Sequence, residues 1–443
     1  MTFTRMWPRM RQLVKISLLV ACVGSSAGAA VAVPFETVPD RAPGELLPAS
    51  MVSGPNFHVI APVHGDGLMD HFVVDSRFGS FDAYGRAALA VRIHEIAALT
   101  ALSKTSDVQI AAGGAVQGAE SEVKTATRVV AHPVQIVTGI PKGIAHLFGG
   151  YKARGEELTA DAKSSAKSLD SENSSRGVRA SGKAAERAAK SYAAHYLGIT
   201  AAERAYYRKL GVDPYTDNQV LRDTIRRDAK IAAAAGFGMK FVGFVGIPGI
   251  GIAQRAVNAI YNEDPAVIRQ RTRKALAGFG LSPTEVTSFM NAPLLSPTRQ
   301  VVMLSAVQAL HGVAQRGELL RHAIGLTSDE EVQVYVRSLE LLVRANESRP
   351  VASVIPGVRL PAARRVDGSL VVCGAFESVY WTKRVSRLES QLRAALPDTA
   401  PGKVREFWIA GTMSERALRA AHELGWDVHE VPEELTAQVA APE

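Results

Sequence analysis

The densest group of potential metal ligands consists of His64, Asp66, Asp70 and His71, which fall within eight residues. Imidazole nitrogens and carboxylate oxygens can together hold a divalent metal ion. The spacing matches no standard metal site, and the Gly-Asp-Gly sequence inside the group is typical of a turn. We therefore favour a polar turn ahead of a β-hairpin. A metal or catalytic site at His64 to His71 stays an alternative, with the metal unknown.

A second group with possible catalytic chemistry lies near the C-terminus, where Cys373 precedes His422 and His429. A thiol and an imidazole can act as nucleophile and base. Cys373 lies inside the apolar run SLVVC, however, and a free cysteine in such a run is usually a small buried hydrophobic residue. We predict that Cys373 is buried and structural.

Two residues after that run are candidates for a ligand crevice. Gly374 and Glu377 follow a predicted strand, and ligands of parallel sheets bind outside the carboxyl ends of the strands. This argument comes from the expected fold alone. We therefore treat Gly374 and Glu377 as candidate crevice residues and assign no catalytic residue.

The block Leu210 to Asn218 contains Asp213, Tyr215 and Asp217, which are chemically capable side chains close together. The favoured interpretation is a loop between two helices, ended by a helix cap at Thr216. The glycine-rich segment 243–251 follows no predicted strand and matches no phosphate-binding motif. We expect no cofactor.

The apolar run Ile231 to Ala253 contains one charge, Lys240, together with six glycines and Pro248. A lysine at the centre of a bilayer costs roughly 3 kcal/mol, and glycine and proline weaken a continuous helix. We predict that this run belongs to a helical protein core and does not span a membrane.

The clearest candidate for an interaction surface is the segment from Val123 to Gly155, which contains five basic residues and no acidic one. Large apolar residues interleave with the cations, as in a helix that lies at a membrane interface. The alternative is that short helices starting at Pro133 and Pro141 pack on the neighbouring domain. The candidate binding residues are Lys124, Arg128, Lys142, Lys152 and Arg154.

The N-terminus has the three parts of a secretory signal: basic residues up to Lys15, an apolar stretch from Ile16 to Val23, and small residues ending at Ala32. The apolar stretch is too short to span about 30 Å of hydrocarbon. We predict export, to the periplasm or envelope, with cleavage near Ala32. Lipidation of Cys22 after the sequence Leu-Val-Ala is the alternative.

Length and charge set further bounds. A chain of 443 residues with 47% apolar residues suggests two or three domains with sizeable cores. The formal net charge is +8, but four basic residues lie within the first 32, which leaves +4 for the rest. The basic balance is therefore a weak argument for nucleic acid, and we expect no nucleic-acid partner.

The elements that would position these residues form a series of units. Helix caps such as Thr200 with Glu203, Ser282 with Glu285 and Thr327 with Glu330 predict an all-α middle. Apolar runs that alternate with helices after residue 350 predict a small α/β unit with a mainly parallel sheet. The predicted fold class is mainly α with α+β parts. The predicted organisation is a signal peptide (1–32), a linker (33–55), an α+β hairpin-helix unit (56–107), a basic amphipathic segment (108–155), a low-complexity linker (156–191), an all-α domain (192–348), an α/β domain (349–432) and a tail (433–443).

Three segments together resemble a family of uncharacterised exported bacterial proteins. They are SRFGSFDAYGRAALAVRIHEIAAL (76–99), AHPVQIVTGIPKGIAHLF (131–148) and KLGVDPYTDN (209–218). The family has no established activity, so the resemblance implies export and no site residue.

The leading functional hypothesis is a non-catalytic exported protein that associates peripherally with a membrane or an envelope partner. The alternative is an envelope enzyme or small-ligand binder with its site in the C-terminal α/β domain or at His64 to His71. Polar groups from different elements that converge on one pocket would favour the alternative. The oligomeric state is unknown.

Overall fold

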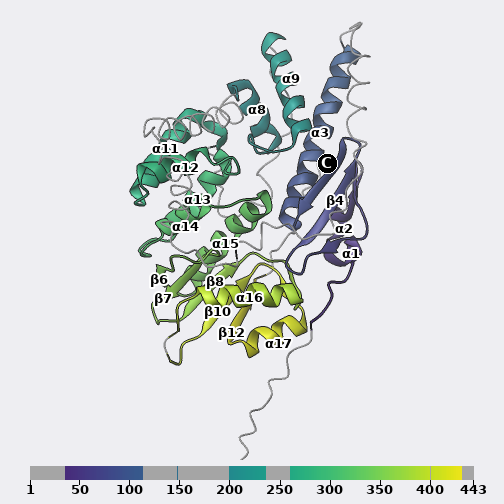
Figure 1. The fold of residues 1–443 in the computed structure, drawn as a ribbon. Helices are drawn as coiled ribbons and strands as arrows, with labels where there is room; N and C mark the ends of the chain where they lie inside the picture. The colour runs from purple at the N-terminus through teal and green to yellow at the C-terminus, as the bar shows by residue number, and fades with distance from the viewer. Residues whose placement is uncertain (1–34, 113–146, 148–198, 236–259, 400, 432–443) are drawn as a thin grey trace, which may run out of the picture. The chain divides into compact units, whose positions relative to one another are not determined.

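The computed structural model describes residues 35–112, 147, 199–235, 260–399 and 401–431. Its first sheet has five strands, and β4, which Figure 1 labels, pairs with β2, β3 and β5. Two short helices precede this sheet, in the segment that we expected to be an extended linker. The elements are α1 (Pro43–Leu46), α2 (Ala49–Val52), β1 (Ser53–Gly54), β2 (Phe57–Val59), β3 (His64–Gly65), β4 (Asp70–Ser76) and β5 (Gly79–Tyr84).

The predicted hairpin is confirmed. Ser76 pairs with Gly79, so Arg77 and Phe78 form the turn, and Gly79 has a φ of +116°. Helix α3 (Arg86–Ala112) follows and packs on β4 and β5, with Leu89 and Ile93 in the core beneath it. The predicted hairpin-helix unit ended at residue 107, within this helix.

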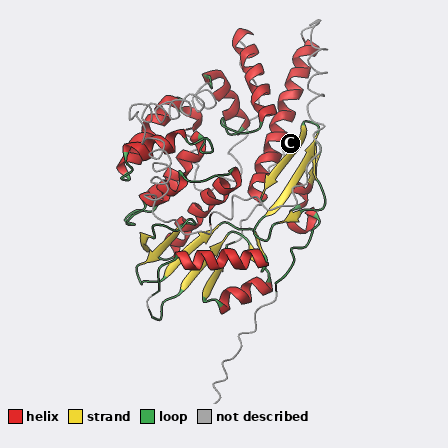
Figure 2. Ribbon diagram, viewed as in Figure 1, coloured by secondary structure: helices red, strands yellow, loops and turns green. Residues whose placement is uncertain are grey.

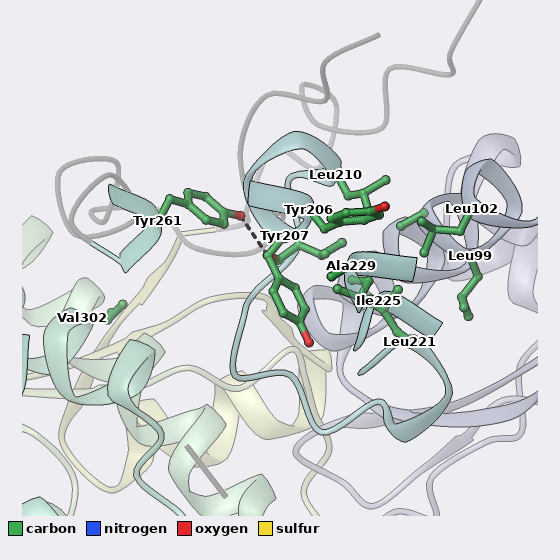
Figure 3. Packing of buried hydrophobic residues seen from close by; sticks show 12 residues of the cluster. Leu99, Leu102, Tyr206, Tyr207, Leu210, Leu221, Ile225, Ala229, Tyr261 and Val302 are labelled. Carbon is green, nitrogen blue, oxygen red and sulfur yellow. Dashed lines mark hydrogen bonds between the residues drawn. The ribbon is translucent and has the colours of Figure 1, made fainter. Parts of the chain in front are cut away.

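A helical region follows α3 in the chain and shares a core with it (Figure 3). Side chains from α3, α8 and α9 meet in this core, and the Tyr261 hydroxyl donates to the carbonyl of Val212 at 3.0 Å. The helices are α8 (Ala201–Leu210), α9 (Gln219–Ala235), α11 (Pro265–Gly278), α12 (Pro283–Asn291), α13 (Pro297–Ala309), α14 (Gly317–Ala323) and α15 (Asp329–Ser348).

The helix caps explain where these helices begin. Thr200 and Ser282 cap α8 and α12 with complete capping boxes, as predicted. Two predicted caps are shifted along the chain. Asn218 in place of Thr216 caps α9, and Ser328 in place of Thr327 caps α15. The shift is possible because Asn218 and Ser328 are themselves residue types that cap helices well.

The predicted fold class is wrong about the C-terminal sheet and holds only in part for the helices. The described chain carries three sheets besides its helices, so mainly α describes part of the molecule (Figure 2). Its C-terminal sheet is mixed, with strand order β12-β10-β8-β7-β6, and only β8, β10 and β12 are parallel. The strands β6 and β7 pair antiparallel. The strands and helices of this region are β6 (Val351–Val354), β7 (Ala362–Arg365), β8 (Leu370–Gly374), β9 (Ser378–Val379), α16 (Lys383–Ala395), β10 (Arg405–Ile409), β11 (Thr412–Met413), α17 (Glu415–Glu423) and β12 (Trp426–Glu430).

The strand β7 escaped prediction because its sequence, Ala-Ala-Arg-Arg, lacks an apolar alternation. Arg365 is nevertheless buried, and its guanidinium donates to both oxygens of Glu406 at 2.8 and 2.6 Å and to the carbonyl of Ala345 at 2.9 Å. This buried ion pair joins β7, β10 and the end of α15. A buried charge is tolerated in a strand when its partner is also supplied by the fold.

None of the helices within the described ranges combines the length and the apolar character needed to cross a membrane. Most of the run Ile231 to Ala253, for which we predicted a place in the helical core, lies outside the described residues. Ile231 itself, within α9, is 53% exposed.

We expect Arg365→Ala to lower the free energy of unfolding by about 3 kcal/mol, because it removes the buried guanidinium that binds both oxygens of Glu406 and leaves this carboxylate with the half-exposed Arg349. Urea denaturation measures the change. The control is Arg419→Ala, which removes an exposed pair with Glu415 at 3.5 Å and should cost under about 1 kcal/mol. Equal losses in the two variants would contradict a structural role for the buried pair.

Candidate functional site

A large group of converging polar side chains surrounds a cavity of about 310 Å³, which we call the α3–α15 cavity. Its wall comes from the end of the first sheet, the start of α3, the loop between α8 and α9, and parts of α13 and α15. Ligand pockets typically enclose about 300–1,000 Å³. The charged residues of the wall are Asp82, Arg92, Glu95, Asp213, Asp217, Arg299, Asp329, Arg337 and Glu340.

Local hydrogen bonds shape the loop that carries Asp213. Gly211 ends α8 with a left-handed φ of 66°, and Asn218 begins α9 by accepting from the backbone N–H of Leu221 at 3.1 Å. Between them, Asp213 accepts from the N–H of Tyr215 at 2.9 Å, and Thr216 accepts from the N–H of Asn218 at 3.0 Å. The loop is therefore held in one conformation by its own side chains.

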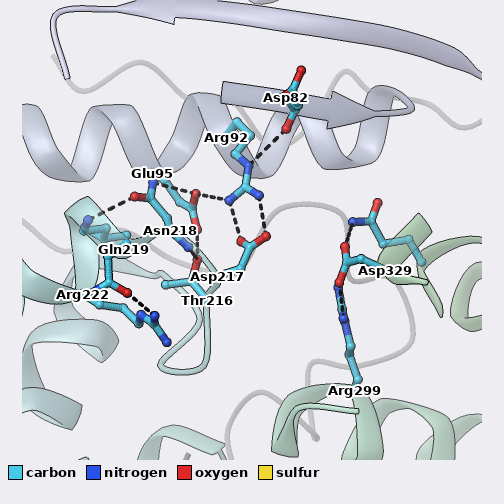
Figure 4. Close-up of polar contacts among 12 residues, drawn as sticks. Asp82, Arg92, Glu95, Thr216, Asp217, Asn218, Gln219, Arg222, Arg299 and Asp329 are labelled. Atoms are coloured by element: carbon cyan, nitrogen blue, oxygen red, sulfur yellow. Dashed lines mark hydrogen bonds and ion pairs between the residues drawn. The ribbon is translucent and has the colours of Figure 1, made fainter. Parts of the chain in front are cut away.

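Glu95 attaches this loop to helix α3 (Figure 4). Its buried carboxylate accepts from the hydroxyl of Thr216 and from the amide nitrogen of Asn218, the latter at 3.0 Å. Arg92, one turn earlier, donates to Glu95 at 2.9 Å and to both oxygens of Asp217 at 2.7 Å. A bidentate pair of this kind fixes orientation as well as distance.

The electrostatics of the wall follow from these contacts. Burial alone would lower the pKa of Arg92, but its hydrogen bonds to Asp217 and the charges of Asp217 and Glu95 raise it above the ordinary value. Burial opposes ionisation of Asp217, but the hydrogen bonds and charge of Arg92 hold its pKa below the ordinary range. Both groups are therefore charged at neutral pH.

Asp213 is in a different environment. Its Oδ1 accepts from the hydroxyl of Thr298 at 2.6 Å and from the Tyr215 N–H, and both donors are neutral. Burial raises the pKa of Asp213 to about 6, although these hydrogen bonds and the charge of Arg299 oppose the rise. A carboxyl with such a pKa can hold or release a proton near neutral pH, which is typical of functional sites.

The far wall is set by α13 and α15. Arg299 donates to Asp329 at 2.5 Å, and Gln333 donates to the other oxygen of Asp329 at 2.6 Å. The apolar part of the wall is formed by Ala87, Ala88, Val91, Pro293, Leu294, Val302 and Val336.

The structure gives the candidate crevice residues other surroundings. Gly374 ends β8 and is buried, and Glu377 is 3% exposed. The Glu377 carboxylate accepts from the N–H of Arg86 at 2.8 and 2.9 Å, at the first residue of α3. Burial raises its pKa, against the charges of Arg86 and of Arg337, which lines the cavity. Glu377 therefore binds the start of α3, whose first turns line the cavity.

The residues of the group His64 to His71 have separate partners. His64 contacts Asp40 at 2.7 Å, and Asp66 accepts from the hydroxyl of Tyr84 at 2.7 Å. Asp70 pairs with Arg41 and accepts from Ser378 at 2.8 Å. Across the residues described, no three His, Cys, Asp or Glu side chains are placed to hold a metal ion.

Cys373 is fully buried, as predicted, and burial raises the pKa of its thiol well above the ordinary value. His429 lies elsewhere on the sheet, stacked on Trp408 at 4.8 Å between ring centroids. The five basic residues proposed as a binding surface, Lys124, Arg128, Lys142, Lys152 and Arg154, lie outside the described residues.

Sequence reasoning considered Asp213, Tyr215 and Asp217 but missed Arg92, Glu95 and the contributions of α13 and α15. One signal was present. The predicted helix carries apolar residues around most of its circumference, with Arg92, His94 and Glu95 as a polar interruption. Polar residues in such a helix are buried and must find partners.

No family model, curated protein or solved structure matches this chain. The resemblance to a family of exported bacterial proteins therefore stays a prediction. Two of the three segments that carry it, residues 76–99 and 209–218, contribute to the wall of the α3–α15 cavity.

Asp213→Asn tests the environment of this carboxyl. Because the pKa of Asp213 is raised in the folded state, the native protein binds its proton more tightly than the unfolded chain does. The aspartate therefore costs stability increasingly as pH rises from about 4 to about 6, and the cost stays constant above that. We expect the variant to gain stability relative to the wild type over this interval, by about 1–3 kcal/mol.

Urea denaturation at a series of pH values measures this difference. Asp398→Asn, at an exposed position outside the cavity, is the matched control and should follow the wild type. A stability difference between Asp213→Asn and the wild type that does not change with pH would refute the raised pKa.

Proposed function

We propose that this protein binds a small organic molecule in the α3–α15 cavity. The observation that carries the proposal is convergence: charged side chains from α3, the loop after α8, α13 and α15 surround one space of about 310 Å³. Ligand sites combine an apolar wall with a few positioned polar groups, and this cavity has both.

Two further features support the proposal. The cavity wall is held by hydrogen bonds before any ligand arrives, through Glu95, Arg92 and Asp217, which lowers the ordering cost of binding. Asp213 adds a carboxyl that exchanges its proton near neutral pH, the property required of a general acid or base. Binding is the function that the geometry supports, and Asp213 is the residue on which a reaction would depend.

We also infer association with a membrane or envelope partner after export, on the evidence of composition. The segment from Val123 to Gly155 holds five cations, no acid and many apolar residues. Basic residues near an anionic surface contribute about 1 kcal/mol each. This second function is compatible with the first, because it uses different residues.

The cavity is tested by filling it. Ala88→Phe places a phenyl group on the half-buried wall of α3, and we expect it to abolish binding of fragments that bind the wild type. Saturation-transfer NMR with a library of small soluble fragments measures binding. The control is Ala394→Phe, which adds the same group at an exposed position of α16. Absence of any binder to the wild type, or equal binding by the folded Ala88→Phe variant, would refute the proposal.

Membrane association is tested by co-sedimentation with anionic vesicles at low and high salt. We expect salt-sensitive binding that is lost when Lys124, Arg128, Lys142, Lys152 and Arg154 are all changed to Gln, because their attraction to the headgroups is removed.

The matched control removes the same charge from exposed positions elsewhere. It changes Arg273, Lys274, Arg387, Lys403 and Arg419 to Gln. Equal loss of binding in both variants would indicate a general effect of charge and contradict a specific surface. Absence of vesicle binding by the wild type would also contradict it.

A further inference from the structure

The charge balance of the α3–α15 cavity is the first indication of what it binds. Among the described residues, its wall carries six carboxyl groups and three guanidinium groups. Two of the guanidinium groups are engaged with carboxylates of the same wall, since Arg92 binds Asp217 and Glu95 while Arg299 binds Asp329. The wall therefore has an excess of negative charge, in a chain whose formal net charge is +8.

Asp213 is a carboxyl of the wall whose negative charge is weakly compensated. Its hydrogen bonds come from the Thr298 hydroxyl and the Tyr215 N–H, and among the described residues it forms no ion pair with lysine or arginine. By contrast, Glu95 and Asp217 each contact the guanidinium of Arg92. A carboxylate removed from water without a charged partner gains most from a cation brought to it.

The surroundings of Asp213 include an apolar surface. Val302 and Val336 line the same cavity, with Ala88 and Val91 of α3. Tyr215, two residues after Asp213 in the chain, also lines the cavity. A ligand that fits both features carries a positive group on an apolar body.

We infer that the ligand of the α3–α15 cavity is a small organic cation, a protonated amine on an apolar body, with its ammonium group against Asp213. The inference rests on the proposed function and names the ligand class of that site. The ammonium would donate charge-assisted hydrogen bonds, which are about twice as strong as those between neutral groups.

The groups that face Asp213 determine how pH acts on this contact. Arg299 of α13 lowers the pKa of Asp213, and the negative charge of Glu95 on α3 raises it. Three tyrosines nearby, Tyr207, Tyr215 and Tyr261, have raised pKa values because they are buried, so they stay neutral. The carboxyl of Asp213 is then the group of this set that titrates near pH 6.

An ammonium group binds the ionised carboxylate, so its affinity rises with pH through about 6 and becomes constant above that value. Below this range, affinity falls by up to about tenfold for each pH unit. The affinity of a neutral ligand does not rise with pH in this way. The affinity of an anion falls as pH rises.

The experiment uses three probes of one shape: benzylamine, benzyl alcohol and benzoate. Isothermal titration calorimetry measures their binding to the purified protein at pH 5 and pH 7.5, where benzylamine stays protonated. We expect benzylamine to bind most tightly, and about tenfold or more weakly at pH 5 than at pH 7.5. Asp213→Asn should weaken the binding of benzylamine at pH 7.5 by at least about tenfold and remove the pH dependence of its affinity. The exposed control, Asp398→Asn, should match the wild type.

Benzoate or benzyl alcohol binding as tightly as benzylamine would overturn the inference, as would benzylamine binding that is unchanged in Asp213→Asn or independent of pH. Failure of all three probes would overturn it as well. These results leave the proposed function intact as long as other fragments bind and Ala88→Phe excludes them. If the Asn variant does not fold, the pH series on the wild-type protein decides alone.

Discussion

The contact on which the cavity depends is the one between Glu377 and the start of helix α3. A buried carboxylate from the C-terminal region accepts from the first backbone N–H of a helix that begins 291 residues earlier. The N-terminus of a helix carries unpaired N–H groups and a partial positive charge, so a carboxylate there is stabilised in spite of its burial. Gly85 makes the approach possible, because a Cβ at this position would lie 2.8 Å from Oε1 of Glu377. The first turns of α3, which line the cavity, are therefore positioned by the sheet that follows α15.

Buried and partly buried acids of this protein are stabilised in different ways, and Asp213 differs from Glu406, Glu377 and Glu95. Glu406 has the guanidinium of Arg365, and Glu377 has a helix N-terminus together with Arg86. Glu95 has Arg92 and two neutral donors. Asp213 has neutral donors alone within the described chain. The first three carboxylates hold elements together, whereas Asp213 is left with less compensation at the wall of a cavity. Residual electrostatic cost at a cavity is the pattern expected where a ligand completes the site.

Sequence reasoning succeeded where structure is determined locally. The hairpin with Gly79, the caps at Thr200 and Ser282, and the apolar strand around Cys373 follow from residue types within a few positions. It failed where a residue is explained by a distant partner. Arg365 looked unsuited to a strand because Glu406 lies 41 residues away, and the strand was missed. Glu95 looked like an ordinary helical residue because Thr216 is 121 positions away. Glu377 was correctly placed beyond the end of β8, but the space there is occupied by the start of α3.

The loop from Gly211 to Asn218 shows that a local structural role and a functional role need not compete. We favoured a simple connection between helices because the polar residues of the loop are typical of turns and caps. The structure uses Thr216 and Asn218 in that way, and Oδ1 of Asp213 accepts from the Tyr215 N–H as a turn requires. Yet the same hydrogen bond fixes the Asp213 carboxyl at the wall of the cavity. A side chain anchored by its own backbone loses little entropy when a ligand binds, so turn-forming residues are well suited to a binding site. In this loop the turn and the site coincide, because the turn is what positions the carboxyl.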